Sequence, residues 1–331
     1  MLGLWRTWRA LSDRGIMGIN CRNADYVLKL NDRKHYPLVD DKILTKERAL
    51  AAGIQVPEKY DVISSDSELR RLRALTDQHA DFVIKPAQGA AGEGIMVIAD
   101  RFDDFYRTVS GRLLRHDELE YQISNILTGM YSLAGVRDRA LIEYRVKPDP
   151  VFSQISYEGV PDIRIIVLWG YPVMAMVRLP TQQSGGKANL HQGAIGVGVD
   201  LTTGQTLGGS WLNARITKHP DTYNPVAGIS VPQWHDFMTL AAGCYDLCHL
   251  GYIGVDMVLD EEKGPLMLEI NARPGLNIQI SNNAGLLLRT RAVEAHREQL
   301  QSQDKTETPA QRVIVAQTIA SEYAADHETT V

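Results

Sequence analysis

The chain has 331 residues, of which 44% are hydrophobic and 23% are charged. This is an ordinary globular composition, and the length allows two or three packed lobes. The formal net charge of −5 gives no electrostatic footprint for duplex nucleic acid, so we expect no nucleic-acid partner. No apolar run reaches the roughly 18 to 20 residues that cross a bilayer, and the start lacks a signal-peptide pattern.

The three cysteines, Cys21, Cys244 and Cys248, fit no zinc-binding pattern. Cys244 and Cys248 are four residues apart on a predicted helix over residues 232–250, where they are expected to line the core. We therefore expect a soluble protein of the reducing cytoplasm.

The first 15 residues place Leu4, Trp5, Trp8 and Leu11 on one stripe of a predicted helix. We expect this stripe to pack on the protein's own body. Docking on a partner or a membrane surface is the alternative.

The next stretch predicts a helix over residues 42–52, a strand over 60–63, a helix over 67–78 and strands over 82–86 and 95–98. Lys42 lies in the first helical turn, and Lys85 ends a strand just before the loop 88–94. The glycines of this loop let backbone N–H groups approach an anion, which favours a mobile flap over phosphates; they are Gly89, Gly92 and Gly94. A plain hairpin turn is the alternative, since the loop is neither a Walker A loop nor a dinucleotide fingerprint.

A helix over residues 117–132 and a strand over 140–146 follow, and in this strand Glu143 is the one acid beside Ile142 and Tyr144. It could meet a ribose hydroxyl or a lysine. Two further apolar strands, 162–169 and 173–179, contain Arg164 and Arg178, which need anionic partners there. A structural salt bridge is the alternative for each arginine.

The polar loop 184–193 carries Asn189 and His191 and is of the sort that holds binding residues on a rigid frame. Residues beyond 284 are predicted to be helical, and residues 300–331 to be a tail or a loosely attached helix.

Three oxygen-bearing side chains stand on a predicted hairpin formed by the strands 252–259 and 265–270: Asp256, Glu269 and Asn271. A buried carboxylate needs a fixed cation or a metal ion, and hard oxygen ligands suit Mg²⁺, whose remaining positions water and substrate phosphates fill. The alternative is that the acids pair with Arg273 or Lys263.

The order of these motifs over residues 40–285 resembles the ATP-grasp superfamily. More narrowly, the segments KPAQGAAGEGI, NLHQGA, GVDMV and LEINARPGL resemble the RimK-type α-L-glutamate ligases. The resemblance implies an α+β ATP-grasp fold in which two α+β lobes clasp ATP, here with a shortened N-terminal region. The expected parts are the N-terminal region 1–40, an N-lobe 41–138, a C-lobe 139–290 with the Mg²⁺ site, and a C-terminal helix or tail 291–331.

The resemblance also implies roles for single residues. Lys42 and Lys85 match phosphate-binding lysines, Gly89 to Gly94 the phosphate flap, and Ile142 to Tyr144 the adenine-side hinge. Asp256, Glu269 and Asn271 match the metal ligands, for Mg²⁺ or alternatively Mn²⁺. Arg164 and Arg178 match arginines facing the carboxylate and the transferring phosphoryl group, and Asn189 and His191 match a substrate loop.

Two departures from the RimK-type pattern bear on the substrate. Only some 40 residues precede Lys42, and the chain has Leu179 and Gln192 where arginines are usual. The resemblance implies an ATP-dependent carboxylate–amine ligase that adds an amino acid, glutamate first, to a peptide or other sizeable carboxylate acceptor. A homo-oligomer could complete the pocket. The alternatives are a phosphotransferase acting on a hydroxyl and a nucleotide-binding regulatory protein without chemistry.

Overall fold

The computed structural model describes residues 9–89, 92–132 and 135–324. These residues form two compact units: one contains the described residues within 9–39 and 148–324, and the other those within 40–50 and 55–147. We call them unit 1 and unit 2; residues 51–54 belong to unit 1.

Unit 2 is a six-stranded antiparallel sheet, counted over the described residues, in the order β1-β6-β2-β3-β4-β5. The strands are β1 (Lys59–Ile63), β2 (Phe82–Pro86), β3 (Met96–Phe102), β4 (Phe105–Thr108), β5 (Leu113–Arg115) and β6 (Ala140–Glu143). The helices are α5 (Lys42–Ala51), α6 (Leu72–Gln78), α7 (His116–Leu127) and the 3₁₀ helix η3 (Asp66–Arg71). Alternate residues of β2 and β6, such as Phe82, Ile84 and Ile142, pack with Leu119 and Ile123 of α7 to form its core.

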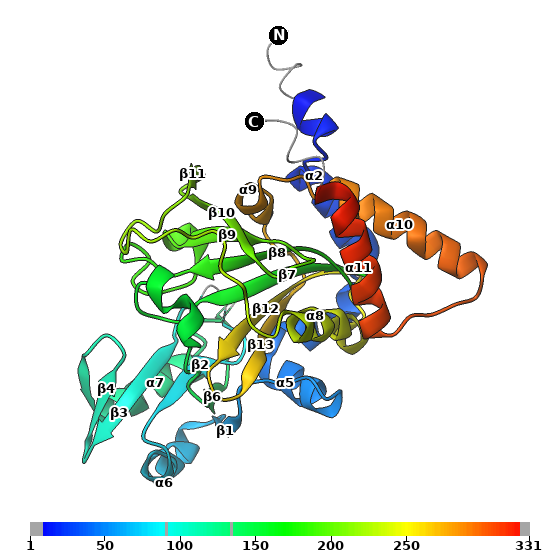
Figure 1. Ribbon diagram of the computed structural model, residues 1–331. Helices are drawn as coiled ribbons and strands as arrows, with labels where there is room; N and C mark the ends of the chain where they lie inside the picture. Colours follow the sequence, from blue (N-terminus) through cyan, green and yellow to red (C-terminus); the bar gives the residue numbers. More distant parts are fainter. Residues whose placement is uncertain (1–8, 90–91, 133–134, 325–331) are drawn as a thin grey trace. The chain divides into compact units, whose positions relative to one another are not determined.

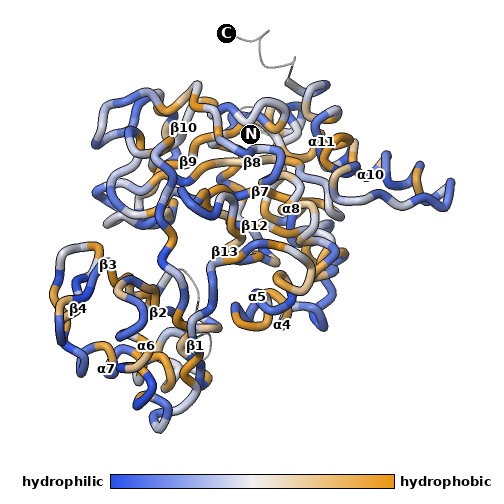
Figure 2. The backbone as a smooth tube through the Cα atoms, turned by 60° about the horizontal axis from the view of Figure 1, so that its bottom comes forward, coloured by the Kyte–Doolittle hydropathy of each residue, from blue (hydrophilic) through white to orange (hydrophobic). Residues whose placement is uncertain are grey.

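Unit 1 contains a seven-stranded antiparallel sheet, again counted over the described residues, in the order β11-β10-β9-β8-β7-β12-β13 (Figure 1). The strands are β7 (Asp162–Leu168), β8 (Tyr171–Leu179), β9 (Ile195–Val199), β10 (Thr206–Trp211), β11 (Ala214–Ile216), β12 (Tyr252–Asp260) and β13 (Gly264–Asn271). Strands β8, β9 and β12 are buried along nearly their whole length. Figure 2 accordingly shows β8 and β9 in the hydrophobic colour.

The helices of unit 1 come from both ends of the chain. Short helical segments near the N-terminus are α2 (Ile19–Cys21), η1 (Arg22–Val27), α3 (Leu28–Leu30), η2 (Arg33–His35) and α4 (Pro37–Asp40). Later in the chain come η5 (Pro150–Ile155), η6 (Leu190–Gln192), α8 (Trp234–Cys248), α9 (Ile278–Asn282), α10 (Leu287–Ser302) and α11 (Pro309–Ala324). None of the described helices combines the length and hydrophobicity that a bilayer crossing needs.

The core of unit 1 joins the two ends of the chain to the sheet. Met17 and Tyr26 from the N-terminal segment pack with Leu168 of β7, Tyr252 of β12 and Val293 of α10. The sequence analysis named residues 1–40 as a separate short region and identified no core residues in the part that follows residue 15.

Helix α11 is firmly packed rather than loosely attached, which corrects the expectation for residues 309–324; residues 325–331 lie outside the described residues. Arg312, Val313 and Ala316 are buried, and the helix lies beside α8 and β8 (Figure 1). Arg312 donates a hydrogen bond from Nη1 to Asp246 of α8 at 3.0 Å. In the sequence, the charged and polar residues at both ends of 300–331 drew attention away from the apolar residues between them, which include Val313 and Ala316.

Several other boundaries differ from the prediction. The helix over residues 67–78 begins as the 3₁₀ helix η3, the helix expected to reach residue 132 ends at Leu127, and the strand expected to reach residue 146 ends at Glu143. Of the predicted N-terminal helix, residues 1–8 lie outside the described part, and residues 9–13 are helical. Cys244 and Cys248 lie buried on α8 as free thiols, as expected.

Candidate functional site

A row of charged side chains crosses one face of the sheet in unit 1. Asp256 on β12 is the register partner of Glu269 on β13 and of Arg164 on β7. Two residues before Arg164 on β7, Asp162 is the register partner of Arg178 on β8. Because side chains two residues apart in a strand point to the same face, Asp162 and Arg164 belong to one row.

The arginines of this row bind its carboxylates directly. Arg164 donates from Nε to Oδ1 of Asp256 at 2.6 Å and from Nη2 to Oδ2 at 2.5 Å. Arg178 donates from Nη2 to Oδ2 of Asp256 at 2.8 Å, and from Nε to Oδ1 of Asp162 at 2.5 Å. Asp256 is 1% exposed, so these bidentate contacts supply the cations that a buried carboxylate needs.

The charges shift the acidities of these groups in different directions. Burial alone would raise the pKa of Asp256, but the charges of Arg164 and Arg178 outweigh it and hold that pKa well below its ordinary value. For Asp162, burial and the neighbouring Asp256 carboxylate raise the pKa, and Arg178 only partly opposes them. The two carboxylates therefore compete for one guanidinium group.

The expected pairing of Asp256 with Arg273 or Lys263 is wrong, because its partners are Arg164 and Arg178. The guanidinium group of Arg273 lies over the ring of Tyr36, 5.7 Å from its centre. Strand register decides this outcome, and register between distant strands cannot be read from the sequence.

Glu269 and Asn271 complete the row beside Asp256. Asn271 donates from Nδ2 to Oε1 of Glu269 and to Oδ2 of Asp256, both at 3.2 Å. Both side chains are half-buried on β13. The structure thus brings together the three residues that the sequence proposed as metal ligands.

These residues fit a divalent cation by their chemistry. The row contains three carboxylates, those of Asp162, Asp256 and Glu269, against two guanidinium groups, so one negative charge is left when all are ionised. Carboxylate and amide oxygens are what Mg²⁺ prefers. Within the described residues no three His, Cys, Asp or Glu side chains gather as a metal cluster.

The predicted substrate loop follows β8 and leads into β9. Asn189 accepts a hydrogen bond at Oδ1 from the backbone N–H of His191 at 3.0 Å and so caps the short helix η6. Thr181 donates to the carbonyl of Gly193 at 2.8 Å and closes the base of the loop. His191 itself is exposed.

Unit 2 contains a second buried charge cluster, centred on Glu143. Lys85 lies 2.5 Å and Lys46 2.8 Å from its carboxylate oxygens, and Lys46 also donates to the carbonyl of Pro57 at 2.7 Å. Burial alone would raise the pKa of Glu143, but the two ammonium groups leave that pKa lowered. Of the two readings of Glu143, the structure shows the lysine contact.

Lys46 belongs to this charge cluster, and the sequence analysis did not single it out. It is 2% exposed, and burial lowers its pKa to about 8. It stands one helical turn after Lys42, and this spacing of four on α5 was the signal that could have found it.

The other predicted nucleotide-binding residues of unit 2 also lie near β2 and β6. Lys42 donates from Nζ to the carbonyl of Gly89 at 2.5 Å, which joins the helix start to the glycine loop. Gly94 has a φ of +72°, and a Cβ there would meet Tyr131 at 2.5 Å, so this turn needs glycine. Gly92 also has a positive φ, whereas residues 90 and 91 of the predicted flap lie outside the described residues.

Ile142 and Tyr144, the predicted hinge residues, flank Glu143. The Ile142 side chain belongs to the core of unit 2, and its backbone lies in β6 between β1 and β2, paired with Asp61 and Ile84. Tyr144 is buried, and its N–H donates to the carbonyl of Glu58 at 2.8 Å.

Several solved structures are similar to this chain at low identity. The ATP-grasp ligase PsnB complexed with a minimal precursor has 13% identity, with 78% of this chain and 59% of that chain covered and a TM-score of 0.42. The D-alanine–D-alanine ligase of Bacillus anthracis complexed with ATP has 13% identity, with 90% and 71% covered and a TM-score of 0.43. A RiPP-associated ATP-grasp ligase of Chryseobacterium gregarium, in complex with ADP and a leader and core peptide, has 18% identity, with 90% and 63% covered and a TM-score of 0.41. The chain spans 59% and 62% of the length of two PsnB chains that it matches.

None of the curated proteins matches the chain. Residues 21–295 match the family described as sugar-transfer associated ATP-grasp. The predicted ATP-grasp fold is therefore confirmed, while the narrower likeness to RimK-type ligases is not part of this match. Because the match covers well over half of the sequence, the chain belongs to the sugar-transfer associated ATP-grasp family.

Proposed function

We propose that this chain is an ATP-dependent carboxylate–amine ligase. The observation that carries the proposal is the row formed by Asp162, Arg178, Asp256 and Arg164, with Glu269 and Asn271 beside it on the same sheet. Phosphoryl transfer depends on positioning and charge neutralisation more than on a protein nucleophile. Rigid guanidinium groups next to hard oxygen ligands suit that chemistry.

The two arginines keep donors for a substrate. Within the described residues, the hydrogen bonds of Arg164 and Arg178 use Nε and Nη2 and leave Nη1 of each without one. Asp162 and Asp256 hold Nε and Nη2 of the guanidinium groups in place. Nη1 of each arginine can therefore point at an anionic oxygen with little loss of conformational freedom. We assign Arg164 to the acceptor carboxylate and Arg178 to the transferring phosphoryl group.

The reaction has two steps. The acceptor carboxylate oxygen attacks the γ-phosphorus of ATP, the bond to the ADP oxygen breaks, and an acyl phosphate forms. The amine nitrogen then attacks the acyl carbon, phosphate leaves with the bonding electrons, and the nitrogen loses its proton to solvent. Arg178 would stabilise the negative charge that develops on the phosphoryl oxygens, where one well-placed donor is worth about 3 kcal/mol.

Nucleotide binding is assigned to Lys42, Lys85, Glu143 and the glycine loop of unit 2. Lys42 and Lys85 would contact phosphate oxygens as point charges. Asp256, Glu269 and Asn271 would hold Mg²⁺, or alternatively Mn²⁺, which supplies neutralisation of phosphate charge when bound. Asn189 and His191 would contact the substrate from their loop.

For the substrate we propose glutamate as the amino acid and a peptide or another sizeable carboxylate as the acceptor. The RimK-type motifs support glutamate, and Leu179 and Gln192, which stand where arginines are usual, support a different acceptor pocket.

A phosphotransferase that acts on a hydroxyl is the second candidate. The family description, sugar-transfer associated, favours it because sugars carry many hydroxyl groups. The two reactions differ in their products: a ligase releases ADP and inorganic phosphate in equal amounts, whereas a phosphotransferase releases ADP and keeps the phosphate on the acceptor.

The test is to incubate the protein with Mg²⁺-ATP, glutamate and either a mixed peptide library or small mono- and dicarboxylates. ADP, inorganic phosphate and product mass are then measured together. Equal ADP and phosphate with a product heavier by one glutamate residue is expected. Phosphorylated acceptor without free phosphate would establish the second candidate instead, and ATP binding without any turnover would indicate a regulatory protein.

A further inference from the structure

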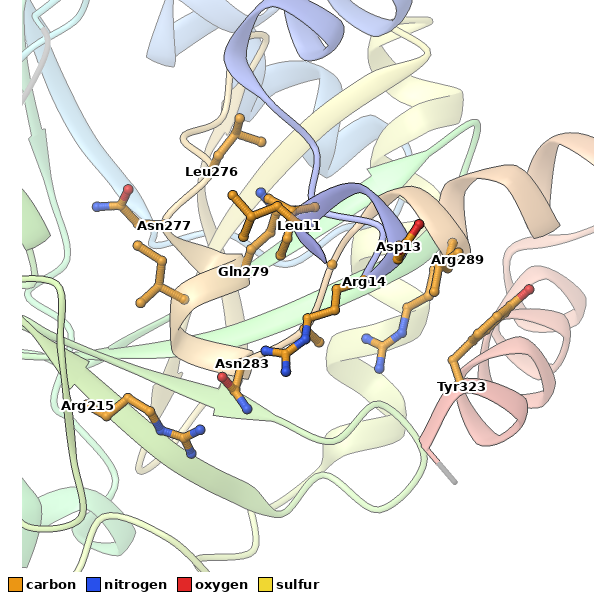
Figure 3. Close-up of a pocket in the computed structure, with 15 residues that line it drawn as sticks. Leu11, Asp13, Arg14, Arg215, Leu276, Asn277, Gln279, Asn283, Arg289 and Tyr323 are labelled. Atoms are coloured by element: carbon orange, nitrogen blue, oxygen red, sulfur yellow. The ribbon is translucent and has the colours of Figure 1, made fainter. Parts of the chain in front are cut away.

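Unit 1 contains a cavity of about 760 Å³ away from the charged row. It is lined by the N-terminal turn, α9, the start of α10, and residues of β11 and α11 (Figure 3). Three arginines line it: Arg14 in the turn, Arg215 on β11 and Arg289 on α10. In Figure 3 the side chains of Arg14 and Arg289 point into the same space, which Asn283 and Arg215 border from the other side. The volume is in the range of small-molecule sites.

Among the described residues, the three arginines have no carboxylate counter-ion in direct contact. In residues 9–89, 92–132 and 135–324, no carboxylate lies within ion-pair distance of Arg14, Arg215 or Arg289. Asp13 is the one acid in the lining, so three positive charges face one negative charge. Arg289 makes one hydrogen bond, from Nη1 to the carbonyl of Val173 at 3.2 Å.

Burial adds to the need for an anion at Arg289. It lowers the pKa of this guanidinium group, and the nearby Asp200 opposes the shift only in part. Burial removes water from the charged guanidinium group of Arg289. A bound anion would replace that hydration with an ion pair. The lining residues alone carry an excess of two positive charges, which suits a dianion.

The cavity wall that carries Arg14 is held in place by buried hydrogen bonds. Gln279 of α9 accepts from the N–H of Met17 at 2.8 Å and of Leu286 at 3.0 Å, and donates to the carbonyl of Met17 at 3.0 Å. At Gly285 a Cβ would lie 2.1 Å from the carbonyl oxygen of Arg14, so the N-terminal turn touches the backbone before α10. These contacts fix the backbone of Arg14.

The other side chains of the lining are largely apolar. Leu276, Ile280, Leu288 and the ring of Tyr323 face the cavity with the arginines. Ile280 is 39% exposed although it is a large hydrophobic residue. A ligand that covered it would gain from the removal of apolar surface from water.

Helix α9 lies between this cavity and strand β8 of the sheet. Ser281 donates to Sδ of Met176 at 3.7 Å and Asn282 to the carbonyl of Ala175 at 2.9 Å, so these residues face β8. Ile280 and Asn283 of the same segment line the cavity. The cavity is thus a separate site from the row of Asp256 and its partners.

We propose that this cavity binds a small molecule that carries a dianionic group, a phosphate monoester or a dicarboxylate, on an apolar body. Arg14, Arg215 and Arg289 hold the dianion, and Ile280 and Leu288 contact the apolar part. The site does not depend on the ligase reaction, since its charges and contacts lie outside the residues assigned to ATP and metal.

The test is calorimetric titration of the full chain, without ATP or metal ions, with phenyl phosphate and with phenylmalonate. We expect at least one of them to bind at a single site, and the one that binds identifies the anion. Arg215→Met and Arg289→Met should each weaken that binding about tenfold or more, as for the loss of a charge-assisted contact. Inorganic phosphate lacks the apolar ring, and phenol lacks the dianionic group. Each should bind at least about tenfold more weakly than the tighter-binding of phenyl phosphate and phenylmalonate.

Arg291→Met is the matched control. Arg291 is exposed on α10, the helix that carries Arg289, but it does not line this cavity. It should leave the affinity within about twofold, a change of only about 0.4 kcal/mol. Arg215 is exposed on a strand edge, so its variant decides the question even if Arg289→Met fails to fold. Absence of binding by both ligands, equal binding of phenol or inorganic phosphate, or unchanged affinity in Arg215→Met would overturn the proposal.

Discussion

Arg164 donates hydrogen bonds to both carboxylate oxygens of Asp256, at 2.6 and 2.5 Å. The exposed fractions of the two side chains are 14% and 2%, so this ion pair lies in a region with little water. A buried pair costs desolvation to form, but removal of one partner leaves the other charge without compensation. The pair therefore constrains both stability and chemistry.

Arg164→Met should lower the free energy of unfolding by roughly 3 kcal/mol, because Asp256 then keeps only Arg178, which Asp162 also binds. Urea unfolding followed by circular dichroism measures the change. The double variant Arg164→Met with Asp256→Asn should recover part of the loss, since the buried charge is removed as well.

Lys29→Met serves as the control for this prediction. Lys29 and Asp25 form an exposed pair, with side chains 64% and 50% exposed, and such pairs contribute about 0 to 1 kcal/mol. A loss of stability no larger in Arg164→Met than in Lys29→Met would show that the buried pair is not held as the structure indicates.

The sequence was sufficient to predict the strands of this region, but it did not predict which strands pair with each other beyond the hairpin. The apolar runs around Asp256 and Glu269 and the charged turn between them predicted the hairpin, and β12 and β13 are found there. That Arg164 rather than Arg273 neutralises Asp256 depends on the pairing of β7 with β12. This contact joins residues 92 positions apart, and no local pattern fixes it.

Glu269→Ala should weaken Mg²⁺-dependent nucleotide binding by about tenfold or more, because the row loses a carboxylate with hard oxygen ligands. The affinity for a nonhydrolysable ATP analogue is measured by calorimetry over a series of Mg²⁺ concentrations. A change within about twofold, or about 0.4 kcal/mol, would show that Glu269 is not a metal ligand.

Glu261→Ala is the matched control for this measurement. Glu261 lies exposed in the turn of the same hairpin, so its removal changes the net charge equally without touching the row. A similar loss of affinity in both variants would mean that net charge, rather than metal coordination, accounts for the effect.

Lys85→Ala should weaken ATP binding more than Lys187→Ala does. Lys85 is buried at the end of β2 beside Glu143, whereas Lys187 is exposed in the loop before β9. Equilibrium binding of a fluorescent ATP analogue compares the two. Equal losses would contradict the division between a nucleotide-binding and a substrate-binding lysine, provided that circular dichroism shows both variants to be folded.

The surroundings of Lys85 show what the sequence could not provide. The strand and its terminal lysine were predicted, and Glu143 was expected to meet a lysine or a ribose hydroxyl. Lys46 was missed because its helix reads as an ordinary charged surface helix, with Lys42, Glu47 and Arg48 around it. Its contacts with Glu143 of β6 and with the carbonyl of Pro57 join residues from different elements, and the sequence of the helix alone does not show them.

Lys46 should make the stability of the protein rise with pH above neutrality. Burial lowers its pKa from the ordinary 10.5 to about 8, so between these values the unfolded chain binds more protons than the folded one. The free energy of unfolding then increases with pH by about 1 kcal/mol per unit within this window. Below pH 7 the contribution is constant, because Lys46 is charged in both states.

Comparison with Lys46→Met isolates this contribution from other titrating groups. The free energy of unfolding of the native chain minus that of Lys46→Met should be flat from pH 6 to 7 and should rise from pH 8 to 10, on the order of 1 to 2 kcal/mol. Urea titrations at each pH measure it. A difference that stayed flat or fell across the upper range would mean that Glu143 compensates the Lys46 charge fully. In that case the ammonium group would be as stable in the folded protein as in water, because its attraction to Glu143 would offset the whole cost of its burial.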